Sequence, residues 1–415
     1  MREHIRLALM MAGTALFTLA GYELMRSAAT VLFKQTYGAE NLPFVMAAMP
    51  FVMFFGVMGY GKLLTAVGPK RTLNLTTLIS AGTILICWLL YRAGLVWVTP
   101  VLFLVKEFYV VLLIEQYWSY MNSQLSKDAA KRLNGPITGF AGLGSVAGGW
   151  LVAQLAVPLG TDVLIPLAAV ALLPSAWLAN KTYTRFGEPL PEALSSAESE
   201  AASRFEATDS LGWQTIRQSK QLSALLAVVL STQIIAAVLD FKFQGLLSSA
   251  FVGRPDEETA FQGQFWFYLN SAAVTFQFVL TPMLLSFVAL RWVHLLMPLV
   301  QVGAIAWALM SPSVMSVGAA FFLFKMFDYS LFRGAKELIY LPLSFNARYR
   351  AKEFIDVFGY RTGKGGSSLV ILALQKLGLQ MMNYYLFIAF GFALLWLLLV
   401  VPLTSERESP SETLG

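Results

Sequence analysis

The chain has 415 residues, of which 57% are hydrophobic and only 13% are charged, and its formal net charge is +6. A soluble domain of this length would carry about 25% charged residues, so this composition excludes an ordinary soluble protein. Apolar runs long enough to cross a bilayer indicate a polytopic helical membrane protein instead. The basic residues lie mostly in short connections between these runs rather than on one solvated face, so we expect no binding to nucleic acid.

Residue types that usually carry metal or covalent chemistry are scarce. Cys87 is the only cysteine, and His4 and His294 are the only histidines. A disulfide within the chain is therefore impossible, and a zinc centre is not expected. No pairing of a nucleophile with a base stands out. We predict that the protein is not an enzyme and has no catalytic residue, no metal and no cofactor.

Twelve apolar runs follow one another along the chain. The first six cover about 7–33, 43–66, 72–91, 95–125, 134–156 and 162–180. The second six cover about 220–250, 262–288, 293–310, 314–342, 354–379 and 382–403. The segment 181–219 between the two sets is polar and cannot bury a core. We predict an all-α fold with twelve transmembrane helices: an N-terminal six-helix bundle (1–180), a cytoplasmic linker (181–219), a C-terminal six-helix bundle (220–403) and a cytoplasmic tail (404–415).

This order of six helices, a linker and six helices is that of the major facilitator superfamily. The connection between the second and third runs supports the comparison, because it resembles the glycine-rich loop with a basic end that the superfamily has at this place. Gly61, Gly68, Lys70 and Arg71 match that loop, whereas Thr65-Ala66 replaces its usual Asp-Arg pair.

The basic residues also predict an orientation. One side of the predicted membrane receives Arg2, Arg6, Lys70, Arg71, Lys127, Lys131, Arg132, Lys181, Arg185, Arg204, Arg217, Lys220, Arg291, the Arg348–Lys352 group and Arg407. The other side has little beyond Lys34, Arg92 and Arg254. The positive-inside rule then places both termini and the linker in the cytoplasm, and an even number of spans agrees with this.

Charged residues inside the apolar runs are the candidates for function. They are Glu23 and Arg26 in the first run; Lys106, Glu107 and Glu115 in the fourth; Asp240 and Lys242 in the seventh; Lys325, Asp328 and Lys336 in the tenth; and Arg361 and Lys364 in the eleventh. A charge at the bilayer centre costs about 2.5–3.5 kcal/mol on insertion scales, and such residues usually face a cavity or a partner. In a major facilitator fold, helices 1, 4, 7 and 10 line the central cavity, and all four carry charges here.

Two interpretations of these charges stay open. Glu23 with Arg26, and Lys325 with Asp328, stand three residues apart and could be neutralised structural pairs. Arg361 and Lys364 share a helix face with no acid within one turn of Lys364, which favours an anionic ligand. Our hypothesis assigns substrate binding to Arg26, Lys325, Arg361 and Lys364, and coupling or gating to Glu23, Glu115, Asp240 and Asp328.

The most specific motif joins the tenth and eleventh runs: YSLFRGAKELIYLPLS, followed by RYRAKEFIDVFGYRTGKGGSSL. It resembles the nucleotide transporter family of ATP/ADP exchangers from plastids and intracellular bacteria. The matching residues there are Tyr329, Leu331, Lys336, Glu337, Tyr340, Pro342, Leu343, Ile355, Asp356, Gly363, Lys364 and Gly366. Further similarity lies at Tyr22, Leu24, Arg26, Gly38-Ala-Glu and Leu42-Pro43-Phe44, and from Glu115 to Gly144.

The resemblance implies an antiporter that swaps phosphorylated nucleotides, with functional charged positions at Glu115 and Lys364. It also implies a bacterial inner membrane location. The first helix departs from the family, because an Arg-Asp…Lys-Asp cluster is replaced by Arg26 followed by Ser27, Ala28, Ala29 and Thr30. The loss of a cavity lysine weakens the case for a highly charged nucleotide, and another organic anion stays open as the solute.

We therefore expect a secondary transporter that moves an organic anion by alternating access, as a nucleotide exchanger or a relative of one. Its partners would be a small anionic substrate and the lipid bilayer, and we expect a monomer. One alternative is a proton-coupled major facilitator transporter of another cargo, such as a siderophore, peptide or drug. A second alternative is a non-transporting membrane receptor or assembly factor.

Overall fold

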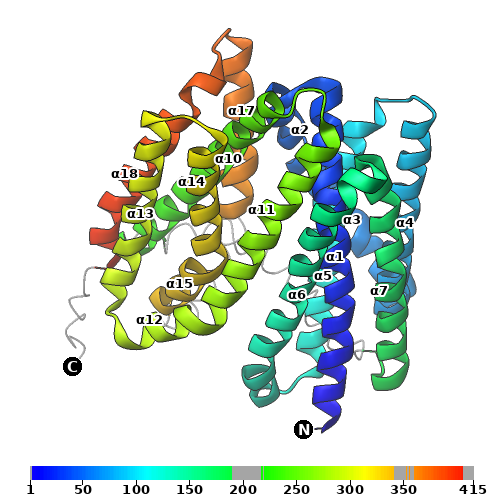
Figure 1. Cartoon of the computed structure of the whole chain (residues 1–415). Helices are drawn as coiled ribbons and strands as arrows, with labels where there is room; N and C mark the ends of the chain where they lie inside the picture. Colours follow the sequence, from blue (N-terminus) through cyan, green and yellow to red (C-terminus); the bar gives the residue numbers. More distant parts are fainter. Residues whose placement is uncertain are drawn as a thin grey trace, which may run out of the picture. The chain divides into compact units, whose positions relative to one another are not determined.

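The computed structural model describes residues 2–188, 216–217, 219–340, 352, 355 and 359–404. Within these residues the regular structure is entirely helical, and no strand is present (Figure 1). The predicted linker lies outside the described residues from 189 to 215, and so does the tail from 405 onward.

The first half of the chain forms long helices with short connections. Its helices are α1 (Arg2–Tyr37), the 3₁₀ turn η1 (Ala39–Asn41), α2 (Leu42–Ala47), α3 (Met49–Val67), α4 (Pro69–Arg92), α5 (Val98–Gln124), α6 (Lys127–Leu159), the 3₁₀ turn η2 (Thr161–Val163) and α7 (Leu164–Phe186). The connection between α3 and α4 is a single residue, Gly68, with φ of 79°. Glycine adopts this conformation without steric cost, and Pro69 starts the next helix because its missing N–H would have no helical partner there.

In the described part of the second half, two helices are interrupted by a π-helical turn. Its helices are α10 (Lys220–Ala250), α11 (Pro255–Thr275), the π turn η4 (Phe276–Leu280), α12 (Thr281–Phe287), α13 (Leu290–Met310), α14 (Val314–Phe327), the π turn η5 (Asp328–Phe332), α15 (Arg333–Tyr340), α17 (Tyr360–Lys376) and α18 (Met381–Thr404). The π turns join α11 to α12 and α14 to α15, so each forms one continuous span. Such turns inside α-helices often occur at functional sites.

Helix lengths agree with the predicted membrane spans. Among the described residues, ten helices are long and apolar enough to cross a membrane. The remaining two predicted runs correspond to α5, which has 27 residues but carries Lys106, Glu107 and Glu115, and to α17, which has 17 residues. The all-helical, membrane-spanning fold predicted from the sequence is therefore confirmed.

The chain separates into two compact units. One contains the described residues of 1–200 together with 243–278 and 368–379, and the other contains those of 201–242, 279–367 and 380–415. The end of α10 and all of α11 thus belong to the same unit as the first seven helices. A division into six-helix bundles at 1–180 and 220–403 stays a prediction.

Close contact between α6 and its neighbours organises the first unit. α6 packs along both α1 and α11, and Figure 1 shows α11 running beside it. A methyl group added at Gly149 would lie 2.7 Å from the backbone nitrogen of Phe267, and one added at Gly263 would lie 2.5 Å from that of Ala153. Small residues let the backbones approach this closely, which is the usual basis of helix association in membranes.

In the second unit, α13 packs against α14 and α18. Gly363 of α17 faces Gln233 of α10, and an added Cβ would lie 2.5 Å from the Cβ of Gln233. A Cβ added at Gly359, just before α17, would lie 3.0 Å from a side-chain methyl carbon of Val229. Both glycines therefore allow close packing against α10.

Candidate substrate-binding and gating site

An ion pair on α1 is the first element of the candidate site. Arg26 pairs with Glu23, one helical turn before it, so the interaction predicted from their spacing is formed. The side chain of Glu23 is 2% exposed and that of Arg26 is 11% exposed. Each of these nearly buried charges compensates the other. Removing one partner of such a pair is destabilising, because it leaves an uncompensated charge away from water.

Helix α11 completes this site with an aromatic ring and an amide. The guanidinium carbon of Arg26 lies 3.4 Å from the ring centroid of Trp266 and 5.1 Å from that of Tyr22. Asn270, one turn after Trp266, donates a hydrogen bond of 3.0 Å to Glu23 and one of 3.4 Å to the carbonyl of Ser145. Residues of α11 therefore contact both charges, Arg26 through a cation–π contact and Glu23 through a hydrogen bond. We call Tyr22, Glu23, Arg26, Trp266 and Asn270 the Arg26 site.

Sequence analysis identified neither Asn270 nor Trp266 as a candidate. Their spacing of four residues places them on one face of α11, which is a weak signal for a shared role. Nothing in the sequence linked that face to α1, since the two helices are separated by the rest of the first half.

Helix α5 carries a second buried cation. Lys106 is 2% exposed, donates a hydrogen bond of 2.7 Å to Glu107 and lies 3.7 Å from the ring centroid of Phe103. Glu115, further along α5, is exposed, and no ion pair to it is found in the described part of the chain. The fold thus places Lys106 inside the first unit and Glu115 on its surface.

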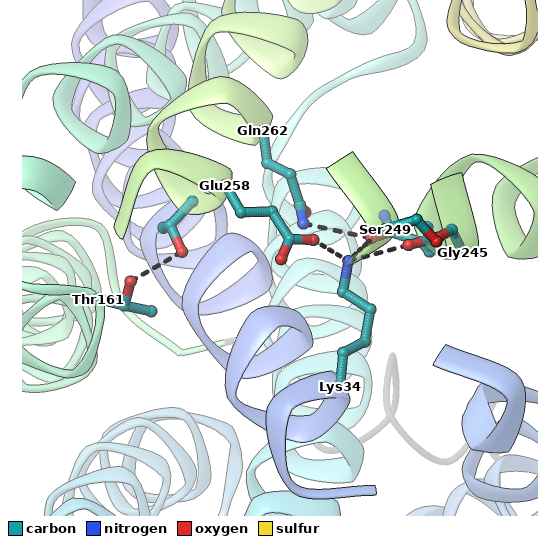
Figure 2. Close-up of polar contacts among 8 residues, drawn as sticks. Lys34, Thr161, Gly245, Ser249, Glu258 and Gln262 are labelled. Atoms are coloured by element: carbon teal, nitrogen blue, oxygen red, sulfur yellow. Dashed lines mark hydrogen bonds and ion pairs between the residues drawn. The ribbon is translucent and has the colours of Figure 1, made fainter. Parts of the chain in front are cut away.

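A buried polar cluster lies near the C-terminal end of α1, about two turns after Arg26 (Figure 2). Lys34 forms an ion pair with Glu258 of α11 and donates a hydrogen bond of 2.7 Å to the side chain of Gln244 of α10. Gln262 donates a hydrogen bond of 3.2 Å to the same Gln244 oxygen. We call these four residues the Lys34 cluster. Sequence analysis had used Lys34 only as a marker of membrane orientation.

For Lys325 and Asp328 in the second unit, the spacing in the sequence had left a structural ion pair open. No ion pair joins Lys325 to Asp328 among the described residues, so the proposed structural pair is absent. The Lys325 ammonium instead lies 5.3 Å from the ring centroid of Tyr329 and 6.0 Å from that of Phe321. These rings stand four residues after and before Lys325, on the adjacent turns of the helix. Asp328 is 7% exposed and begins the π turn η5.

Of the remaining predicted site residues, the structure describes the side chain of Asp240 but not those of Arg361 and Lys364. Arg361 and Lys364 belong to α17, but their side chains lie outside the described residues. Asp240 is half-buried on α10, and the neighbouring Lys242 donates a hydrogen bond of 2.9 Å to the carbonyl of Met382. Among the described residues, no group of three or more His, Cys, Asp and Glu side chains is arranged to hold a metal ion.

Comparison with solved structures shows that the fold is of the major facilitator type. A D-xylose-proton symporter matches with a TM-score of 0.68 and 14% identity over 98% of this chain and 99% of that one. A bacterial homologue of the iron transporter ferroportin in an inward-facing state matches with a TM-score of 0.65 and 16% identity over 97% and 99%. The nucleoside transporter NupG matches with a TM-score of 0.61 and 12% identity over 96% and 98%. At these identities the similarity concerns the fold.

Within this class, the chain belongs to the TLC ATP/ADP transporter family, whose model matches residues 31–406. The ADP,ATP carrier protein 3 of Rickettsia conorii is 23% identical over 367 residues, which cover 76% of this chain and 71% of that protein. The family resemblance inferred from the motif around α15 and α17 is thereby confirmed. So is the prediction of a multi-pass membrane transporter.

Proposed function

We propose that this protein exchanges phosphorylated nucleotides of the ATP/ADP type across the bacterial inner membrane by alternating access. The observation that carries the proposal is the Arg26 site, in which a nearly buried guanidinium lies between the ring of Trp266 and the carboxylate of Glu23. A planar guanidinium matches the oxygens of a phosphate group, and a hydrogen bond between two charged groups is about twice as strong as a neutral one.

In this proposal the carboxylate of Glu23 occupies the place on Arg26 that a phosphate group of the substrate takes when it binds. When no anion is bound, Glu23 neutralises Arg26; when a phosphate group enters, it displaces Glu23 from the guanidinium. Asn270 keeps Glu23 nearby through its hydrogen bond of 3.0 Å, so the carboxylate can return once the substrate leaves. The entering phosphate adds negative charge beside the retained Glu23, so further cations are needed to balance it inside a membrane protein.

The second half of the chain would contribute further cations. Lys325 forms no ion pair within the described residues and faces aromatic rings, so its charge is available to an anion. Arg361 and Lys364 of α17 are proposed as phosphate ligands on the basis of the family motif, and Glu115, Asp240 and Asp328 as coupling or gating residues. The family assignment supports these roles.

The orientation follows from the distribution of basic residues. We propose that both termini are cytoplasmic and that the protein acts as a monomer, because each chain would contain a complete pair of halves. Another organic anion is the second candidate for the solute. The altered first helix favours it, since the lysine and the acids of the family's cluster are absent from the residues that follow Arg26.

The experiment is an exchange assay with the purified protein in liposomes. Vesicles loaded with ADP should take up radiolabelled ATP, and empty vesicles should not, because exchange needs a counter-substrate. Arg26→Ala should reduce this uptake at least tenfold, whereas Arg92→Ala, which removes an exposed cation of α4, should leave it unchanged.

A panel of internal anions separates the remaining possibilities. Failure of all nucleotides with success of sugar phosphates or dicarboxylates would replace the solute and keep the Arg26 site. Uptake that depends on a proton gradient and not on an internal anion would overturn exchange and support the proton-coupled alternative.

A further inference from the structure

The Lys34 cluster is a buried set of polar side chains inside the first unit, joined by an ion pair and hydrogen bonds. The side chain of Lys34 is 1% exposed and that of Glu258 is 5% exposed. Lys34 also donates a hydrogen bond of 3.3 Å to the backbone carbonyl of Gln244, in addition to its side-chain contacts. Figure 2 shows Lys34 and Glu258 pointing toward each other from α1 and α11. These contacts to the cation are therefore made while the end of α10 and the start of α11 are packed on α1.

A second set of polar contacts holds the start of α11 at the same place. The backbone nitrogen and the hydroxyl of Thr161, in the connection between α6 and α7, both donate hydrogen bonds of 2.7 Å to Asp256. The Thr161 hydroxyl also lies 2.9 Å from that of Thr259. Two independent points of the first half, the end of α1 and the α6–α7 connection, thus fix the first turns of α11.

The position of these contacts suggests their role. Lys34 and Arg92 lie at the ends of α1 and α4, on the side that the charge distribution places opposite the termini. The α10–α11 connection at 251–254 lies on that side too. In a transporter made of two halves, substrate can enter from one side only if segments of the two halves separate there. Glu258 and Gln244 belong by sequence to the second half, although they pack on the first.

We propose that Lys34 and Glu258 form a latch that closes the non-cytoplasmic side of the transporter and opens once in each cycle. The inference rests on alternating access in the proposed function but not on the identity of the solute. Separating the pair loses the ion-pair attraction and its hydrogen bonds but returns both charges to water, so the two states differ little in free energy and substrate binding or release can shift the equilibrium.

Thiol labelling from outside the cell tests the latch directly. Ser248 of α10 stands one turn after Gln244, and its hydroxyl is buried. With Cys87→Ser as background, Ser248→Cys provides a single reporter. A membrane-impermeant maleimide should label it slowly in the parent protein. Lys34→Met and Glu258→Gln should each raise the labelling rate about tenfold, because the population of the open state increases.

Two controls make the result specific. The charge-swapped variant Lys34→Glu/Glu258→Lys should return labelling toward the parent rate. Arg92→Met breaks an ion pair with Asp162 of 3.4 Å at the same end of the unit, but its side chain is 59% exposed, so labelling should not change. Glu258→Gln retains hydrogen-bonding capacity. It therefore still tests the effect of the lost ion pair on the labelling rate if Lys34→Met does not fold.

The latch is overturned if Glu258→Gln leaves the labelling rate of the reporter unchanged, or if Arg92→Met raises it equally. Labelling needs no nucleotide. An absence of nucleotide exchange would therefore refute the proposed function while the labelling rates still decide the latch.

Discussion

Asn270 of α11 donates a hydrogen bond of 3.0 Å to Glu23 of α1, across 247 positions of sequence. Glu23 is the ion-pair partner of Arg26, so this amide fixes the carboxylate that neutralises the candidate phosphate ligand. The contact connects a helix of the second half to the charged centre of the first.

Replacing Asn270 should separate its structural from its functional contribution. Asn270→Ala should destabilise the protein by about 1.5–3 kcal/mol, the usual value of a hydrogen bond to a charged group. Asn270→Asp should lower nucleotide exchange more strongly, since a second carboxylate would compete for Arg26. Thermal unfolding and exchange in liposomes measure the two effects. Asn383→Ala, an exposed amide of α18, is the control and should change neither. Wild-type exchange in Asn270→Asp would contradict the proposed role of Glu23.

Trp266 should control how well Arg26 is oriented. A desolvated cation–π contact contributes about 2 kcal/mol, which corresponds to about a 30-fold change in an equilibrium constant. Trp266→Leu should therefore weaken the apparent affinity for nucleotide by up to this factor, and Trp266→Phe should have a smaller effect because a ring remains. Concentration dependence of exchange is the measurement. Equal affinities for the Leu and Phe variants would show that the cation–π contact between the ring and Arg26 does not contribute to nucleotide affinity.

The contact between α6 and α11 should be sensitive to a single methyl group. Gly263→Ala would place its Cβ 2.5 Å from a backbone nitrogen of Ala153, so we expect destabilisation by about 1–3 kcal/mol. Gly303→Ala on the exposed side of α13 meets nothing within 4 Å. It should be neutral or stabilising by about 0.5–1 kcal/mol, since alanine favours a helix over glycine. Melting temperatures in detergent distinguish the two variants, and equal values would refute the tight packing.

Asp328 should contribute to transport rather than to stability. Its carboxylate is buried and no hydrogen bond to its Oδ1 is found in the described part of the chain. Asp328→Asn keeps the shape and removes the charge, so the melting temperature should not fall, whereas the exchange rate should change if the residue takes part in gating. A lower melting temperature with unchanged exchange would identify Asp328 as a structural residue.

Local spacing allowed some of the site to be predicted. Glu23 and Arg26 are neighbours on one helical turn, and their pairing depends on little beyond the helix itself. For Lys325 and Asp328 the same spacing left pairing open, and no ion pair joins them in the described part of the chain. There the lysine lies near rings on the adjacent turns, and the helix changes from α to π at Asp328. Competing partners at similar spacing cannot be ranked from the sequence alone.

The sequence by itself determined the membrane-spanning fold and the family. A bilayer requires about 20 apolar residues for each helix, so hydropathy alone reveals the spans, and the motif from Tyr329 to Gly366 is specific enough to identify the relatives. Tertiary structure decided which charges meet. Lys34 with Glu258, and Glu23 with Asn270, come from helices far apart in the chain. Their pairing depends on the glycine contacts that bring α11 against α6 and α1, because a side chain meets a distant partner only where the backbones pack closely enough for it to reach.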